Sequence, residues 1–129
     1  MIVRKLRIGN FRGIEQLEWV IPADKKLICI IGAGDSGKTT VLDALDWLLG
    51  DRWNLPISFA DFKDESKPIV VTAALSQIPN ELLSIGSCGL CLRGISEAGE
   101  VASEPFDGYE QCLVVELSIG IDFEPTWSI

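Results

Sequence analysis

The sequence has no histidine, fewer basic than acidic residues and no long apolar segment. Its 11 lysines and arginines against 19 aspartates and glutamates give a net charge of −8, which disfavours a general nucleic-acid-coating role. The longest apolar run, "LICII", is far shorter than the roughly 20 residues that a membrane span needs. The N-terminus alternates polar and apolar residues and lacks the apolar core of a signal peptide. We therefore expect a cytoplasmic protein with no membrane partner.

The length of 129 residues, of which 47% are apolar, is enough for one domain with a real core or for part of one. Basic residues cluster near the start, in "RKLR" and at Arg12. A group of this size is typical of a solvated strand face, so it does not by itself indicate nucleic-acid binding.

Four cysteines are present without an export signal, so we expect free thiols. Cys88 and Cys91 form a C-x-x-C pair that could bind zinc or act as a redox couple. The missing histidines leave few partners for a tetrahedral zinc site, and "LCLRG" is typical of a strand, not of the helix that follows a redox pair. We interpret the cysteines as small apolar residues.

Hydrophobic periodicity predicts the helices and strands of this chain. Alternating apolar residues in "IVRKLRI" (Ile2, Leu6 and Ile8) and in "EQLEWVI" predict a hairpin whose turn, "GNFRG", uses Gly9, Asn10 and Gly13 for positive φ. Residues 26–32 are typical of a central strand that is covered on both sides. Residues 38–49 are typical of an amphipathic helix that ends at Gly50, with its apolar face expected at Val41, Leu42, Leu45, Leu48 and Leu49. Residues 51–68 form a long connection with a helical turn near 59–62. A strand at 69–75, a short helix at 78–84, a hairpin about 97–99 and strands in "QCLVVELSI" and "EPTWSI" complete the expected series.

The stretch "GAGDSGKTT" after the buried strand satisfies G-x-x-x-x-G-K-[ST] through Gly32, Gly37, Lys38 and Thr39. A strand before and a helix after it are the context in which this pattern binds phosphates. Backbone N–H groups and the helix dipole attract the anion, the lysine reaches the β and γ phosphates, and the Thr39 hydroxyl suits Mg²⁺. Asp35, inside the loop, is expected to point away from phosphate and to cap the helix.

With these motifs the chain resembles the N-terminal end of ABC-type ATPase heads of the RecF, SMC and OLD group, and most of all OLD-like ATP-dependent nucleases. The resemblance is based on "GNFRG" between two strands, on "GAGDSGKTT" with a helix beginning "VLDAL", and more weakly on the β-rich tail. It implies an α/β (α+β) P-loop NTPase lobe over residues 1–129, with an N-terminal β-hairpin, a central strand, loop and helix, and a β-rich C-terminal half.

The resemblance also implies the site and its ligands. ATP and Mg²⁺ are the expected cofactors, and Arg12 corresponds to an arginine that approaches the nucleotide phosphates. The remaining expected contacts lie in or beside the loop, with Thr39 also as the metal ligand: Gly32, Gly34, Ser36, Gly37, Lys38, Thr39 and Thr40. Expected partners are ATP or ADP, a second copy or the rest of the ATPase head, and DNA only through regions beyond this chain.

Several parts of such a head are missing from the sequence. It has no signature helix, no Asp-Glu strand, no downstream histidine and no TOPRIM nuclease domain, and no glutamine can be assigned to a Q-loop. "LSIGID", ending at Asp122, is expected to be a surface turn instead of an acidic metal strand. We therefore expect an ATP-binding part of an ATPase in DNA metabolism or defence that does not hydrolyse ATP alone. A non-catalytic nucleotide-binding module or truncated product is the alternative, and a self-contained small P-loop kinase or NTPase is a weaker one.

Overall fold

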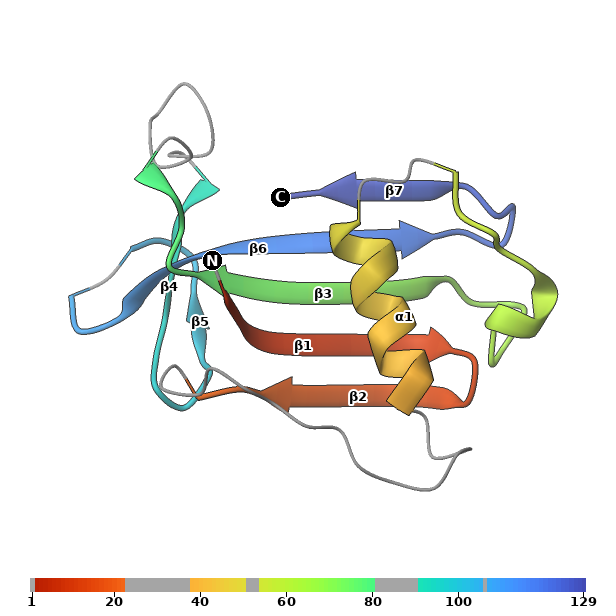
Figure 1. Cartoon of the computed structure of the whole chain (residues 1–129), viewed down its shortest axis with the longest axis horizontal. Coiled ribbons are helices and arrows are strands. Elements are labelled where there is room, and N and C mark those ends of the chain that lie inside the picture. The colour runs from red at the N-terminus through yellow and green to blue at the C-terminus, as the bar shows by residue number, and fades with distance from the viewer. Residues whose placement is uncertain (1, 23–37, 51–53, 81–90, 106) are drawn as a thin grey trace.

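The computed structural model describes residues 2–22, 38–50, 54–80, 91–105 and 107–129. They form a curled antiparallel sheet with one α-helix lying across one face (Figure 1). Neighbouring strands follow the order β2-β1-β3-β6-β4-β5, and β7 pairs with β6. The elements are β1 (Ile2–Phe11), β2 (Ile14–Val20), α1 (Lys38–Leu49), the 3-10 turn η1 (Phe59–Asp61), β3 (Ile69–Ser76), β4 (Arg93–Ile95), β5 (Val101–Ala102), β6 (Glu110–Ile119) and β7 (Pro125–Ser128).

The predicted mixture of sheet and helix is confirmed at this coarse level, with β-structure dominant among the described residues. The expected central strand at 26–32 lies outside these residues. So do residues 81–84 of the short helix expected at 78–84. The described fold is thus an antiparallel sheet that carries α1, the helix expected to follow the glycine loop.

The N-terminal hairpin is confirmed, with β1 and β2 paired antiparallel. Its turn differs from the prediction, because positive φ occurs at Asn10 (59°) and Arg12 (54°) and not at Gly9 or Gly13. Asparagine tolerates this conformation, whereas an arginine adopts it only where surrounding contacts compensate for the strain. The unusual backbone at Arg12 therefore points to contacts that hold this residue in place.

The alternation predicted for β1 holds at Leu6 and Ile8, which are buried, but Ile2 is only half-buried. A register shift against β3 makes Arg4 an extra residue, so the inward and outward positions change there. Arg4 is buried, and its guanidinium pairs with a carboxylate oxygen of Glu110 at 2.6 Å. Sequence periodicity alone could not reveal this bulge.

Helix α1 spans the predicted residues and ends where Gly50 donates its backbone N–H to the Asp46 carbonyl, at 2.8 Å. The buried face differs from the predicted one: it consists of Val41, Ala44, Trp47 and Leu48. Leu42 and Leu49, expected to be inside, are 56% and 45% exposed. An α-helix turns by about 100° per residue, so these two leucines, seven residues apart, lie on one side of α1. That side is displaced from the face that meets the sheet.

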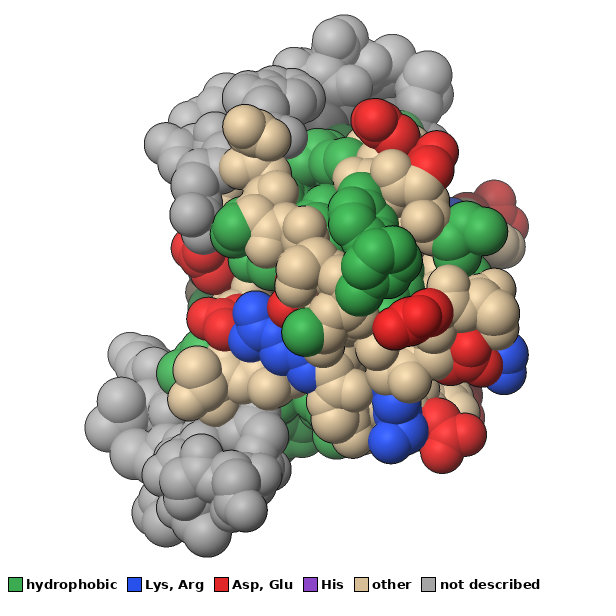
Figure 2. All heavy atoms as spheres, turned by 90° about the vertical axis from the view of Figure 1, so that its right-hand side faces the viewer, with side chains coloured by type: hydrophobic (Ala, Val, Ile, Leu, Met, Phe, Trp, Pro, Cys, Tyr) green, Lys and Arg blue, Asp and Glu red, His purple; other side chains and the backbone are tan. Residues whose placement is uncertain are grey.

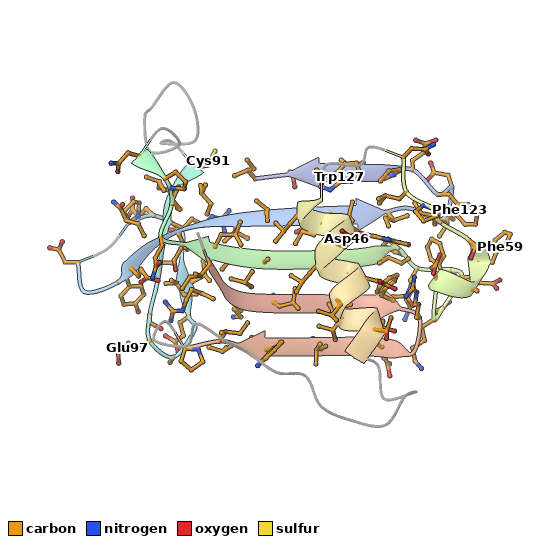
Figure 3. The ribbon with its side chains drawn as sticks, in the orientation of Figure 1. Asp46, Phe59, Cys91, Glu97, Phe123 and Trp127 are labelled. Atoms are coloured by element: carbon orange, nitrogen blue, oxygen red, sulfur yellow. The ribbon has the colours of Figure 1, made fainter. Side chains whose placement is uncertain are left out.

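The core lies between α1 and the strands β1, β3 and β6. At the C-terminal end of the helix, Trp127 of β7 donates its indole N–H to the Trp47 carbonyl oxygen at 3.3 Å (Figure 3). This contact joins β7 to α1 across the upper part of the sheet. The residues of the described core that are fully buried include Leu6, Ile8, Phe11, Ala44, Ile69, Leu117 and Ile119.

The C-terminal half follows the prediction closely. Strands β4 and β5 form a short hairpin in which Gly99 has a φ of 86°. Strands β6 and β7 are joined by a turn in which Phe123 donates its backbone N–H to Gly120. The expected surface turn ending at Asp122 is confirmed. Within the part of the chain that the structure describes, no helix has the length and apolar character needed to cross a bilayer.

Candidate functional site

The predicted site residues fall into two groups. Gly32, Gly34, Ser36 and Gly37 lie outside the described residues, as does Asp35, so the loop contacts remain predictions. Lys38 is the first residue of α1. Thr39 is exposed and Thr40 half-buried in the first turn. Helix α1 therefore starts in the GKT segment, in agreement with the helix predicted over residues 38–49.

The N-terminal end of α1 suits an anion. Its first turn contains no acidic residue. The first N–H groups of a helix have no partner within the helix itself, and the positive end of the helix dipole attracts negative charge there. The exposed hydroxyl-bearing residue Thr39 offers an oxygen of the kind that Mg²⁺ prefers. The described part of the site is thus compatible with a phosphate and its metal ion.

Arg12 lies in the β1–β2 turn and is bound by two segments far away in the sequence. Its backbone N–H donates to the Asp61 carbonyl at 2.7 Å, and its Nε donates to Asp61 Oδ1 at 2.9 Å. Its terminal guanidinium nitrogen donates to Asp43 Oδ2 at 2.5 Å. Arg12 therefore joins the hairpin to α1 and to η1, and these contacts compensate for its positive φ.

Aromatic rings support the same guanidinium. Its carbon lies 4.7 Å from the ring centroid of Phe11 and 5.6 Å from that of Trp47. The two rings are themselves in contact, with centroids 5.1 Å apart. A cation above aromatic faces is attracted by their quadrupoles, so the arginine is positioned by rings as well as by carboxylates.

The charge of Arg12 is stable in this setting. Partial burial acts to lower the pKa of the guanidinium, but the hydrogen bonds and negative charges of Asp43 and Asp61 outweigh it and raise the pKa. Arg12 thus remains a cation beside the second turn of α1. The structure places it close to the helix that follows the glycine loop and paired with two carboxylates, and its predicted approach to a nucleotide phosphate stays a prediction.

The sequence interpretation did not single out Asp43 and Asp61. Asp43 follows Thr39 by four residues, and this spacing puts the two on one side of a helix. That signal was available in the sequence. Asp61 lies on a separate connection and meets Arg12 only through the tertiary fold.

The same end of the molecule carries an aromatic cluster, shown from that side in Figure 2, where hydrophobic side chains gather between acidic and basic ones. Phe59 and Phe123, labelled in Figure 3, have ring centroids 4.9 Å apart. Phe62 stacks on Phe123 at 5.6 Å. These contacts join η1 to the β6–β7 turn, and so they support the backbone that presents Asp61.

The structure describes two of the four cysteines. Cys91 is exposed and Cys112 is buried, and neither is in a disulfide. Cys29 and Cys88 lie outside the described residues. No cluster of three or more metal-ligating side chains occurs among the residues that the structure describes. Cys112 packs in a small apolar cluster with Ala74 and Ile95, as expected for a thiol that acts as a small apolar residue.

We expect thiol labelling to separate these two cysteines. Burial raises the pKa of the Cys112 thiol, so at pH 8 it holds less of the reactive thiolate and is also shielded. In the folded chain iodoacetamide should modify Cys91 at least about tenfold faster than Cys112. Peptide mass spectrometry measures both rates, and denaturant should make them similar. Equal rates in the folded chain would contradict the packing of β6.

The family of this chain follows from its match to a family model. Residues 1–88 match the family model described as AAA ATPase domain. Since the match covers more than half of the 129 residues, the chain belongs to the AAA ATPase domain family.

A curated relative gives a more particular likeness. The OLD nuclease of Thermus scotoductus strain SA-01 is 34% identical to this chain over 77 residues. The alignment covers 55% of this chain and 14% of that nuclease, so the chain spans only a small share of its relative's length. Together the two matches confirm the predicted resemblance to the N-terminal region of an OLD-like, AAA-type ATPase.

Proposed function

We propose that this chain provides the phosphate-binding half of an ATP site within an OLD-like ATPase. The proposal is supported by the position of α1, which starts at Lys38 directly after the glycine loop, and by the chain's membership of the AAA ATPase domain family. The glycine-loop backbone and Lys38 bind the β and γ phosphates, and Arg12 contributes a second positive charge.

The metal belongs to the same proposal. Thr39 is exposed in a helix turn without acidic residues, so its hydroxyl is available to a cation that is shared with the phosphates. Mg²⁺ bound there would neutralise phosphate charge. The residues that hold the nucleotide are then Gly32, Gly34, Ser36, Gly37, Lys38, Thr39, Thr40 and Arg12.

The partner that we propose is the rest of an ATPase head. Leu42 and Leu49 are exposed on the outer side of α1, away from the sheet. A helix that is apolar on two sides is typical of one packed between two layers. A further layer over α1 would complete the P-loop lobe. Action in DNA metabolism or defence is proposed through the likeness to an OLD nuclease, and it would depend on regions beyond this chain.

Isothermal titration calorimetry tests the nucleotide site. The 129-residue chain should bind Mg·ATP or Mg·ADP weakly, and Lys38→Ala should abolish this binding, because the loop lysine supplies the mobile charge on the phosphates. Lys67→Ala is the matched control, since Lys67 is exposed and pairs only distantly with Asp64, at 3.8 Å. No binding by the wild type would refute the proposed function. Equal binding by wild type and Lys38→Ala would place the nucleotide elsewhere.

A further inference from the structure

We propose that Asp61 and Asp43 act differently on Arg12. Asp61 holds the guanidinium permanently, whereas Asp43 pairs with a terminal guanidinium nitrogen only until a nucleotide phosphate replaces that carboxylate. The inference rests on the proposed ATP site and adds to it two positioning residues. It also makes Asp43 a residue whose negative charge opposes nucleotide binding. The two carboxylates differ in burial, in number of contacts and in place relative to α1, and each difference supports a different role.

Asp61 has the features of a permanent partner. The residue is buried, with 7% of its surface exposed. One carboxylate oxygen accepts from Arg12 Nε at 2.9 Å, and the other accepts from the Ser58 backbone N–H at 2.9 Å. The Asp61 carbonyl oxygen also accepts the Arg12 backbone N–H. Breaking the pair would leave a buried carboxylate without its cation, which is unfavourable.

Asp43 has the features of an exchangeable partner. Its side chain is 39% exposed, and its pairing with Arg12 is a single contact to one terminal nitrogen. Solvent weakens ion pairs at such positions, so little free energy is lost when the carboxylate is replaced. Asp43 lies on α1 four residues after Thr39, a distance of about 6 Å along the helix axis. A phosphate bound beside Thr39 at the start of α1 would therefore lie about one helical turn from Asp43.

The aromatic rings limit how Arg12 can respond. Phe11 and Trp47 lie against the guanidinium, and Asp61 binds its Nε edge. The guanidinium is planar, so the terminal nitrogen that now donates to Asp43 can donate to another anion while Nε stays on Asp61. Guanidinium binds phosphate strongly through paired N–H groups, and a nucleotide phosphate carries more negative charge than a carboxylate. The phosphate thus replaces Asp43 while Asp61 keeps the arginine in place.

Neutral isosteres of the two carboxylates test the inference through nucleotide affinity. Asp61→Asn should weaken Mg·ATP binding about tenfold, because Arg12 loses its fixed partner. Asp43→Asn should strengthen it about threefold or more, because the competing charge is gone. Asp46→Asn removes the same charge one turn farther along α1 and should change affinity by less than about 1.5-fold. If both carboxylates were merely structural, both replacements would weaken binding.

A double-mutant cycle separates exchange at Arg12 from general repulsion of phosphate. In an Arg12→Ala background, the gain from Asp43→Asn should disappear. A gain that persists without Arg12, or weaker binding by Asp43→Asn, would overturn the inference even though Lys38→Ala still abolishes binding. If circular dichroism shows that Asp61→Asn does not fold, the inference is tested by Asp43→Asn alone, through the direction in which it changes Mg·ATP affinity. Absence of binding by the wild type would overturn the proposed function and this inference together.

Discussion

Replacing Phe11 by alanine should lower the free energy of unfolding by about 3–5 kcal/mol. Phe11 is fully buried at the end of β1 and packs against Trp47, with ring centroids 5.1 Å apart. The substitution removes a large apolar side chain, leaves a cavity, and deletes the ring under the Arg12 guanidinium. Because small domains are stabilised by only about 5–15 kcal/mol, much of the chain's stability depends on this one ring.

Chemical denaturation followed by tryptophan fluorescence measures the change. Phe59→Ala is the matched control, since Phe59 is 63% exposed and contacts mainly Phe123. Its loss should cost no more than about 1.5 kcal/mol, the upper range for an aromatic pair. Phe11→Leu should lie between the two variants. Similar losses for Phe11→Ala and Phe59→Ala would contradict the packing of β1 against α1.

ATP hydrolysis by the 129-residue chain alone should remain at background, although Lys38 and Thr39 are present. Phosphoryl transfer needs neutralised charge on the transferred group and an attacking water held in line. The loop supplies only the first, and each missing stabilising group costs roughly 10²–10³-fold in rate. Asp43 and Asp61 already pair with Arg12, and Asp122 lies in a surface turn.

A phosphate-release assay with purified chain checks this expectation, with Lys38→Ala as the control for contaminating ATPase. Steady turnover that is lost in Lys38→Ala would contradict it and would favour the self-contained NTPase. Activity that arises only when the chain is joined to a region supplying a signature helix and an acidic strand would support the part-of-an-ATPase interpretation. Binding without turnover in any context would favour the non-catalytic nucleotide-binding module.

Several local elements of this protein could be predicted from its sequence alone. The alternation on either side of "GNFRG" predicted the β1–β2 hairpin, and the GKT segment with Gly50 predicted the bounds of α1. The turn ending at Asp122 was predicted in the same way. These features depend on residues close together in the chain, where periodicity and turn chemistry dominate. The glycine-loop pattern also led to the ATPase family that the comparisons confirm.

The residues that surround Arg12 could be identified only from the folded chain. Asp43 and Asp61 lie 31 and 49 residues away in the sequence, and no local pattern links them to the β1–β2 turn. The inner side of α1 was decided in the same manner: the sheet buries Trp47 and leaves Leu42 exposed, although both are apolar. Hydrophobicity indicates that a side chain favours burial, but it does not indicate which face of the helix the sheet will cover. Long-range packing supplies that information, and it alone brought two carboxylates to one arginine beside the helix that follows the glycine loop.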